Sequence, residues 1–203
     1  SVLRKFHLTH LFFNKLKKLR LTTRLAPLGR STVDPHTKFH RKKMGIPPTT
    51  KITDRLYLGS IEGTDPSILK KYGITHIINA AKDASYTTSL PRVNLRLDDV
   101  PEENLFRVLE PSRITIKRIL RPKLQEGPAD KSLNNNKVFI HCMAGVSRSV
   151  SVLIYYLMKE GLPLDNGRKM SYDQALEYVR RSRPIANPNI GFEKTLRAVE
   201  NVG

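Results

Sequence analysis

The stretch Lys137-Val138-Phe139-Ile140-His141-Cys142-Met143-Ala144-Gly145-Val146-Ser147-Arg148-Ser149-Val150 decides the fold of this 203-residue chain. Residues 137–140 are typical of a short buried strand, and the apolar stretch 150–159 is long enough for a helix. A loop between a strand and a helix turns successive backbone N–H groups toward one point and adds the positive end of the helix dipole. The pattern therefore predicts a binding site for a dianion, with Cys142 at its floor and Arg148 at its rim.

The same loop predicts a reactive thiol. Inward-facing N–H groups, a helix N-terminus and Arg148 all favour a thiolate, so we expect Cys142 to be ionised near neutral pH. These groups would also hold a phosphate dianion, with Arg148 gripping two of its oxygens. The Ser149 hydroxyl can donate a hydrogen bond to the sulfur, and His141 is expected to fix the loop rather than act as a base. Gly145 permits a backbone turn that a Cβ would hinder.

The spacing His-Cys-x2-Gly-x2-Arg-Ser at residues 141–149 resembles the Cys-x5-Arg signature of the cysteine-dependent protein tyrosine phosphatases. The rest of residues 52–200 is similar to their dual-specificity branch, in its small stand-alone form. The matching stretches occur in the family's order: Ile52-Thr53-Asp54-Arg55-Leu56-Tyr57-Leu58-Gly59-Ser60, Gly73-Ile74-Thr75-His76-Ile77-Ile78-Asn79, Leu97-Asp98-Asp99, the loop itself, and Pro188-Asn189-Ile190-Gly191-Phe192. The resemblance covers roughly three-quarters of the chain.

This resemblance implies hydrolysis of phosphotyrosine and phosphoserine/threonine monoesters through a cysteinyl-phosphate intermediate, with phosphorylated proteins as substrates and without a metal or cofactor. It implies a catalytic set of Cys142, Arg148, Asp99 and Ser149. The phosphate-binding loop would comprise His141, Met143, Ala144, Gly145, Val146, Ser147 and Arg148. The expected fold is α/β, with a central mixed, largely parallel sheet flanked by helices.

A second functional group is needed because the leaving oxygen requires a proton, which a carboxylic acid beside the site can supply. Asp98 and Asp99 follow a predicted strand. The family pattern places the acid five residues before an Asn that opens the next helix, so Asn104 points to Asp99, with Asp98 as the alternative. Both carboxylates could instead serve a turn or a helix start. Asn79 and Asn189 are expected to buttress the loop rather than touch substrate.

The remaining pattern alternates strands with helices, which predicts a sheet covered on both faces and a site at the carboxyl ends of the strands. Pro111 predicts a kink or a restart in a helix over residues 104–120. Further strands are expected at 52–60, 74–79 and 93–97, and further helices from Pro66 to Gly73, from Ser171 (through a capping box with Gln174) to Pro184, and over 192–199. Residues 121–136 are expected to form a polar, mobile loop.

Composition separates a basic N-terminal extension, residues 1–50, from residues 51–203, which the resemblance assigns to a catalytic domain. The formal net charge is +18, and residues 1–50 hold twelve Lys/Arg against one acidic residue, Asp34. A short amphipathic helix is expected near residues 9–20, followed by a Pro-containing linker over 22–50. The extension has four readings: a mitochondrial-type transit segment, a contact to an acidic partner or anionic surface, a dimerisation helix, or a solvated tail.

The single cysteine excludes an internal disulfide and a Cys-based zinc site. A functional free thiol implies a reducing compartment, either cytosol or nucleus, with mitochondria considered because of the basic N-terminus. No apolar run approaches the roughly 20 residues of a transmembrane helix.

The remaining loop positions bear on the substrate class, because none of them is a cation: Met143, Ala144, Val146 and Ser147. Phosphoinositide phosphatases of this superfamily tend to place Lys or Arg there, so their absence favours phosphoprotein. Two alternatives stay open. One is a phosphatase of RNA 5′-phosphate or phospholipid, and the other is a protein that binds phosphorylated partners and acts through its basic N-terminus.

Overall fold

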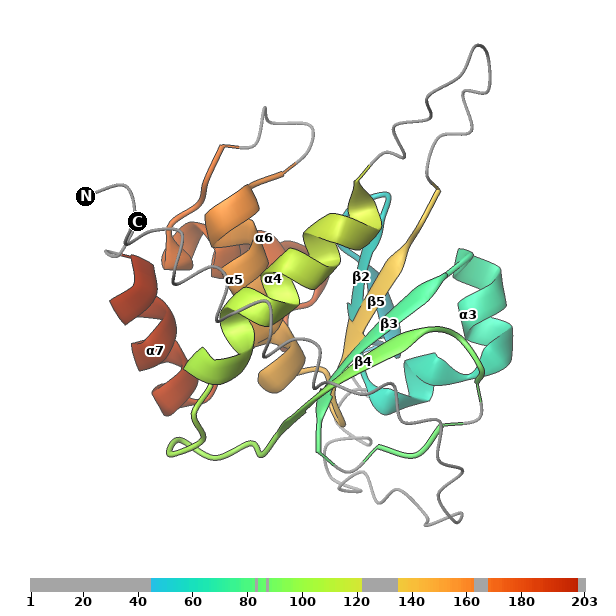
Figure 1. Ribbon diagram of the computed structural model, residues 1–203, viewed down its shortest axis with the longest axis horizontal. Helices are drawn as coiled ribbons and strands as arrows, with labels where there is room; N and C mark the ends of the chain where they lie inside the picture. Colours follow the sequence, from blue (N-terminus) through green and yellow to red (C-terminus); the bar gives the residue numbers. More distant parts are fainter. Residues whose placement is uncertain (1–44, 83, 87, 122–134, 163–167, 201–203) are drawn as a thin grey trace, which may run out of the picture.

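The computed structural model describes residues 45–82, 84–86, 88–121, 135–162 and 168–200 (Figure 1). The predicted amphipathic helix near residues 9–20, nearly all of the linker and most of the 121–136 loop lie outside these residues. Among the described residues, no helix is both long and apolar enough to cross a bilayer.

A five-stranded sheet forms the centre of the molecule, with the order β1-β2-β5-β3-β4 (Figure 1). Only the edge pair β1·β2 is antiparallel, and the other three pairs are parallel. This confirms the mixed, largely parallel sheet. The strands are β1 (Thr49–Lys51), β2 (Leu56–Gly59), β3 (His76–Ala81), β4 (Arg92–Leu97) and β5 (Val138–His141). Strand β1 spans the 50/51 division drawn from composition.

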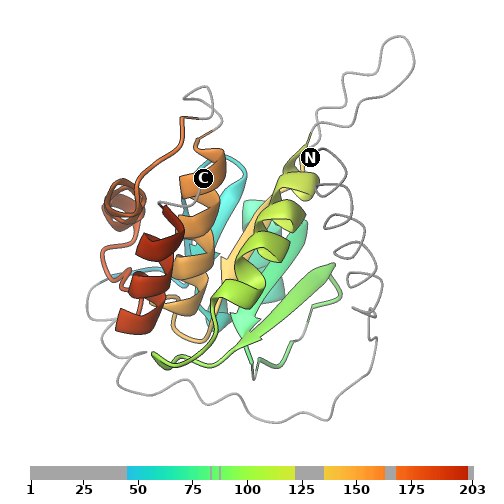
Figure 2. The same ribbon diagram turned by 60° about the vertical axis from the view of Figure 1, so that its left-hand side comes forward.

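Helices cover both faces of the sheet, as expected from the alternating pattern (Figure 2). One face packs through Tyr57, Ile77 and Phe139 with Leu69 of α3, and the other carries the larger apolar core under α4 to α7. The elements are the 3-10 helix η1 (Ile61–Thr64) and the α-helices α3 (Pro66–Tyr72), α4 (Phe106–Leu120), α5 (Arg148–Glu160), α6 (Tyr172–Ser182) and α7 (Ile190–Glu200).

Local sequence explains where two of these helices begin and end. Helix α3 begins with the Asp65 side chain accepting from the Ser67 backbone N–H, and it ends at Gly73 in the left-handed conformation. Helix α6 begins with the predicted capping box, in which both hydrogen bonds between Ser171 and Gln174 are present.

Of the two outcomes predicted at Pro111, the restart is wrong, because α4 runs from Phe106 to Leu120 as one helix that includes the proline, while the kink stays a prediction. Proline removes one backbone hydrogen bond from a helix interior. The buried positions continue on both sides of it, with Val108 and Leu109 before and Ile116 after. Packing of this apolar face against the sheet therefore outweighs the local effect of the proline.

The parallel pairing of β4, β3 and β5 places the functional segments together. The carboxyl ends of these strands meet at one edge of the sheet, at the bottom of Figure 1. Asp98 and Asp99 follow β4, Cys142 follows β5, and α5 begins at Arg148 beside them. The residues that the sequence singled out therefore lie at the carboxyl ends of the strands, as expected.

Candidate active site

The loop after β5 wraps around the sulfur of Cys142, whose side chain is fully buried. The Gly145 backbone N–H donates to Sγ at 3.2 Å, and the Ser149 hydroxyl donates to it at 3.3 Å. Gly145 has φ +70°, and a Cβ built there would lie 2.5 Å from the backbone of Gly59. A glycine is therefore required both for the turn and for its close approach to β2.

The surroundings of the sulfur favour its thiolate. Burial alone raises the pKa of the Cys142 thiol, but the charge of Arg148, the Ser149 hydroxyl and the backbone N–H groups of Ser149 and Gly145 act in the opposite direction. The pKa of Cys142 consequently lies below its ordinary value. The direction of this shift agrees with the expectation from the sequence, and ionisation near neutral pH stays a prediction.

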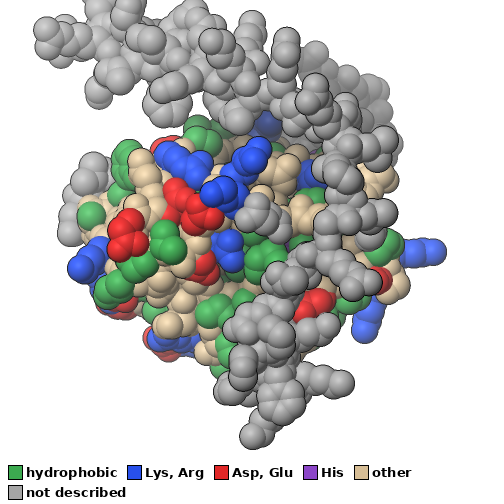
Figure 3. Space-filling model, turned by 90° about the horizontal axis from the view of Figure 1, so that it is seen from below, with side chains coloured by type: hydrophobic (Ala, Val, Ile, Leu, Met, Phe, Trp, Pro, Cys, Tyr) green, Lys and Arg blue, Asp and Glu red, His purple; other side chains and the backbone are tan. Residues whose placement is uncertain are grey.

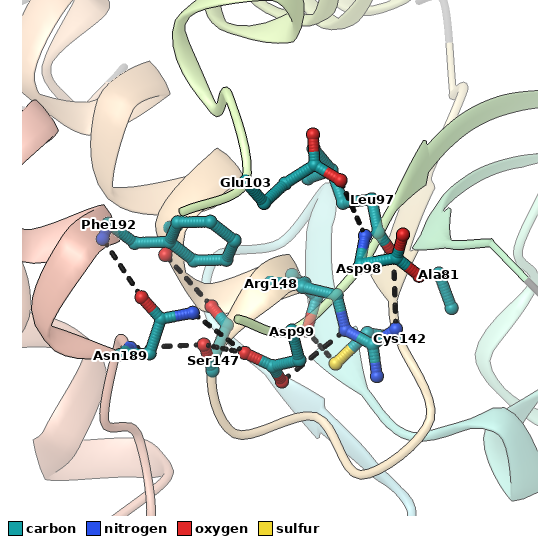
Figure 4. Close-up of polar contacts among 12 residues, drawn as sticks. Ala81, Leu97, Asp98, Asp99, Glu103, Cys142, Ser147, Arg148, Asn189 and Phe192 are labelled. Atoms are coloured by element: carbon teal, nitrogen blue, oxygen red, sulfur yellow. Dashed lines mark hydrogen bonds and ion pairs between the residues drawn. The ribbon is translucent and has the colours of Figure 1, made fainter. Parts of the chain in front are cut away.

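Arg148 closes the site from the first turn of α5 (Figure 4). Its Nη1 donates to the Leu97 carbonyl at 3.2 Å, which ties it to the end of β4. Its Nε lies 3.4 Å from Asp99 Oδ2 as an ion pair, yet this buried Nε has no hydrogen-bond partner among the described residues. The side chain therefore presents a donor that an oxyanion in the loop can use.

The structure brings Asp99, rather than Asp98, to the loop (Figure 4). Asp99 Oδ1 accepts from the Ser147 hydroxyl at 2.6 Å and from Asn189 Nδ2 at 3.0 Å. Asp98 instead forms an ion pair with Lys82 at 2.9 Å. Of the two acids that the sequence singled out, Asp99 is thus the one held within reach of Arg148.

The two asparagines expected to buttress the loop differ. Asn189 contacts it directly, because its backbone N–H donates to Ser147 Oγ at 3.1 Å and its side chain holds Asp99. Asn79 hydrogen-bonds the Ala81 backbone and Asn94, so it supports the irregular pairing of β3 with β4 rather than the loop. The expectation for Asn79 is therefore wrong, since its position on β3 directs it to the neighbouring strand.

His141 is entirely buried and acts as a fixed part of the loop's base. Its Nδ1 lies 3.2 Å from the Cys142 carbonyl oxygen and its Nε2 lies 3.1 Å from the Tyr86 hydroxyl. Burial lowers the pKa of His141 to about 4, so the ring is neutral at pH 7. A neutral, hydrogen-bonded ring fits the structural role that the sequence suggested.

Sequence reasoning missed two side chains that hold β4 and the Asp98–Asp99 segment: Glu103, just before α4, and Arg107, in its first turn. Glu103 Oε2 accepts the Asp98 backbone N–H at 2.9 Å, and Glu103 Oε1 accepts from Arg107 Nη2 at 3.3 Å. Arg107 also donates to the carbonyls of Leu95 and Arg96, and Arg96 has the unusual φ of +56°. The four-residue spacing of Glu103 and Arg107 was the only sequence signal for this pair.

Among the residues that the structure describes, no group of three or more His, Cys, Asp or Glu side chains is arranged to hold a metal ion.

Comparison with known proteins matches residues 56–202 to the model for "Dual specificity phosphatase, catalytic domain". Dual specificity protein phosphatase 1 of Arabidopsis thaliana is 31% identical over 152 residues, which are 73% of this chain and 67% of that protein. Protein-tyrosine-phosphatase MKP1 of the same plant is 33% identical over 148 residues, 70% of this chain but only 16% of its own length. The Yvh1 phosphatase domain of Chaetomium thermophilum superposes with a TM-score of 0.62 at 27% identity, covering 76% of this chain and 96% of that one.

These matches and the Cys142–Arg148 loop define the class: the chain belongs to the dual-specificity phosphatase catalytic-domain family within the cysteine-dependent protein tyrosine phosphatases. The structure and the family model agree on the folded unit, since β2 to α7 coincide with the matched residues 56–202.

Proposed function

We propose that this protein is a phosphoprotein phosphatase that hydrolyses phosphotyrosine and phosphoserine/threonine monoesters through a cysteinyl-phosphate intermediate. The observation that carries the proposal is the Cys142 sulfur, which is surrounded by the Gly145 N–H, the Ser149 hydroxyl and Arg148 at the floor of a strand–loop–helix turn. Family membership supports the reaction class.

The first half-reaction follows from this geometry. The substrate phosphate seats against the loop's N–H groups and Arg148, whose buried Nε gains an acceptor. The thiolate attacks phosphorus and the bond to the leaving oxygen breaks. Asp99, held by Ser147 and Asn189 at the edge of the loop, supplies the proton that the leaving oxygen takes.

In the second half-reaction, Asp99 accepts a proton from water as the water oxygen attacks phosphorus. The phosphorus–sulfur bond breaks and phosphate departs with the sulfur as a thiolate again. The Ser149 hydroxyl stabilises this thiolate as it leaves, because it already donates to Sγ in the resting structure. No step requires a redox change.

The chain supplies a matched pair of variants for the test. Cys142→Ser should abolish turnover of p-nitrophenyl phosphate in EDTA while retaining binding of a phosphopeptide. On phenyl phosphate, whose leaving group needs a proton, Asp99→Asn should lower kcat by about 10²–10³-fold with little change in KM, since general acid catalysis contributes about that much. Asp98→Asn is the control, because its carboxylate faces Lys82, and it should stay near wild type. Wild-type turnover by Cys142→Ser would refute the mechanism.

Phosphoprotein rather than a polyphosphorylated substrate is supported by the loop positions without cations: Met143, Ala144, Val146 and Ser147. On the described part of the face at the carboxyl edge of the sheet, Lys and Arg side chains lie among acidic and apolar ones (Figure 3). A panel of phosphopeptides, RNA 5′-phosphate and phosphoinositides tests this. If kcat/KM were higher on RNA 5′-phosphate or on phosphoinositides than on phosphopeptides, that compound would be the substrate class instead.

For residues 1–50 we propose a contact to an acidic partner or anionic surface, on the basis of twelve Lys/Arg against one acid. Removing residues 1–44 should leave p-nitrophenyl phosphate turnover unchanged and abolish binding to anionic vesicles or acidic peptides. A loss of dimer in sedimentation instead would assign the extension to self-association. The reactive thiol supports a reducing compartment, cytosolic or nuclear, as the site of action.

A further inference from the structure

Arg183 is a fully buried arginine that lies behind the phosphate-binding loop, where α6 ends. Its Nε donates to the Gly145 carbonyl at 2.7 Å and its Nη2 to the Ala144 carbonyl at 3.2 Å. Nη1 donates on the other side to the Pro47 carbonyl at 3.0 Å and to Thr50 Oγ1 at 2.9 Å. One guanidinium thus joins the loop to the segment that enters the sheet at β1.

The two loop carbonyls that Arg183 binds belong to the peptide planes that make up the anion seat. A trans peptide is planar, so its carbonyl and its N–H point in opposite directions, and the described residues contain no cis peptide bond. The Ala144 carbonyl shares a plane with the Gly145 N–H, which donates to Cys142 Sγ at 3.2 Å. The Gly145 carbonyl likewise shares a plane with the Val146 N–H, which consequently points away from Arg183.

We propose that Arg183 is a positioning residue for this reaction: by binding the Ala144 and Gly145 carbonyls, it fixes the loop peptides whose N–H groups stabilise the sulfur and the phosphoryl group. This rests on the proposed function. Arg183 contacts the loop at two backbone carbonyls. It acts through the backbone, first by setting the peptide orientation and second by placing a positive charge on the carbonyl side, which strengthens each N–H as a donor.

The close packing of Gly145 against the guanidinium supports an orientation effect. A Cβ added at Gly145 would come within 2.5 Å of Arg183 Nη2, so the two groups meet with no room for a side chain or a water molecule between them. A lysine cannot reproduce this, since its ammonium lacks the planar fork that reaches two successive carbonyls and the β1 segment at once.

The variants Arg183→Lys and Arg183→Met test the proposal in the full chain. The readouts are the pH dependence of Cys142 alkylation by iodoacetamide, the inhibition constant of tungstate, and the thermal midpoint. We expect Arg183→Lys to raise the pKa of the Cys142 thiol by about one unit and to raise the inhibition constant of tungstate about tenfold. Arg183→Met should change both quantities by at least as much. The alkylation profile and the tungstate inhibition constant are measured below the thermal midpoint of each variant, so that folded proteins are compared.

Two controls separate positioning from general stability. Thr50→Val removes an acceptor of Arg183 on the side away from the loop, so it should lower the thermal midpoint while leaving thiol pKa and tungstate affinity unchanged. Arg181→Met makes the same change in charge at an exposed position on α6 and should alter neither. An Arg183→Lys protein with a lower midpoint but wild-type thiol pKa and tungstate affinity would overturn the proposal. Failure of the wild-type protein to hydrolyse phosphate esters would overturn the proposed function instead.

Discussion

Replacement of Ser149 by alanine removes a side-chain hydroxyl that donates to the sulfur at 3.3 Å in a fully buried position. A hydrogen bond to a charged group contributes about 1.5–3 kcal/mol. The Gly145 N–H and Arg148 remain in place, so the lower end applies. Since about 1.4 kcal/mol corresponds to one pKa unit, Ser149→Ala should raise the pKa of the Cys142 thiol by about one unit.

Two assays measure this effect at different steps. The pH profile of Cys142 alkylation by iodoacetamide should shift upward by about one unit. Rapid-quench kinetics with p-nitrophenyl phosphate should show a distinct burst, because the intermediate breaks down about tenfold more slowly when its thiolate leaving group is less stabilised.

A serine two residues later supplies the control. Ser151 is equally buried on the same helix, but its hydroxyl donates to the Ser147 carbonyl at 2.9 Å rather than to sulfur. Ser151→Ala should leave the alkylation profile and the burst as in wild type. If Ser149→Ala shifted the profile no more than Ser151→Ala does, the hydroxyl would have no role in stabilising the thiolate.

Three further predictions concern Gly145, His141 and Glu103. Gly145→Ala should lower the free energy of unfolding by about 3 kcal/mol in urea denaturation, because it adds left-handed backbone strain and overpacking. Gly73→Ala is the control: its φ is also positive, but the added Cβ would lie 3.6 Å from its nearest neighbour, so the loss should be only about 1 kcal/mol. Burial lowers the pKa of His141 from 6.5 to about 4, so between these pH values the histidine is protonated in the unfolded chain but neutral in the folded one. The free energy of unfolding should therefore fall by about 1.4 kcal/mol for each pH unit below 6.5, down to pH 4. His141→Asn should remove this contribution to the pH dependence. Glu103→Gln should reduce kcat more on phenyl phosphate, whose leaving group needs a proton, than on p-nitrophenyl phosphate, and equal losses on the two would exclude a role in placing Asp99.

What the sequence could predict was local. The anion loop, the cap at Ser171 and the ends of α3 depend on residues within a few positions of one another, so their pattern is visible in one dimension. Thiolate stabilisation at Cys142 follows from the same short stretch. The misjudged restart at Pro111 shows the limit, because tertiary packing of α4 overrode a local preference.

The supports of the site were hidden because they join distant segments. Arg183 binds a carbonyl 38 positions earlier in the chain, and Tyr86 binds a histidine 55 positions later. Nothing in the sequence around Arg183 or Tyr86 distinguishes them from an ordinary surface arginine or an ordinary core tyrosine. The strand order, which places β5 between β2 and β3, and the packing of α6 in the same apolar core bring these segments together.

Ser147 shows how the two halves of the chemistry are held in register. Its hydroxyl donates to Asp99 and accepts the Asn189 backbone N–H, while its backbone belongs to the loop that surrounds Cys142. The hydrogen bond to Ser147 therefore ties the proposed acid, Asp99, to the same loop as the proposed nucleophile, Cys142. A displacement of Asp99 relative to the sulfur must break the 2.6 Å hydrogen bond to Ser147 or the 3.0 Å one to Asn189. The acid and the thiolate therefore keep their relative position as long as the loop itself is intact, which makes the loop's rear support at Arg183 a determinant of both.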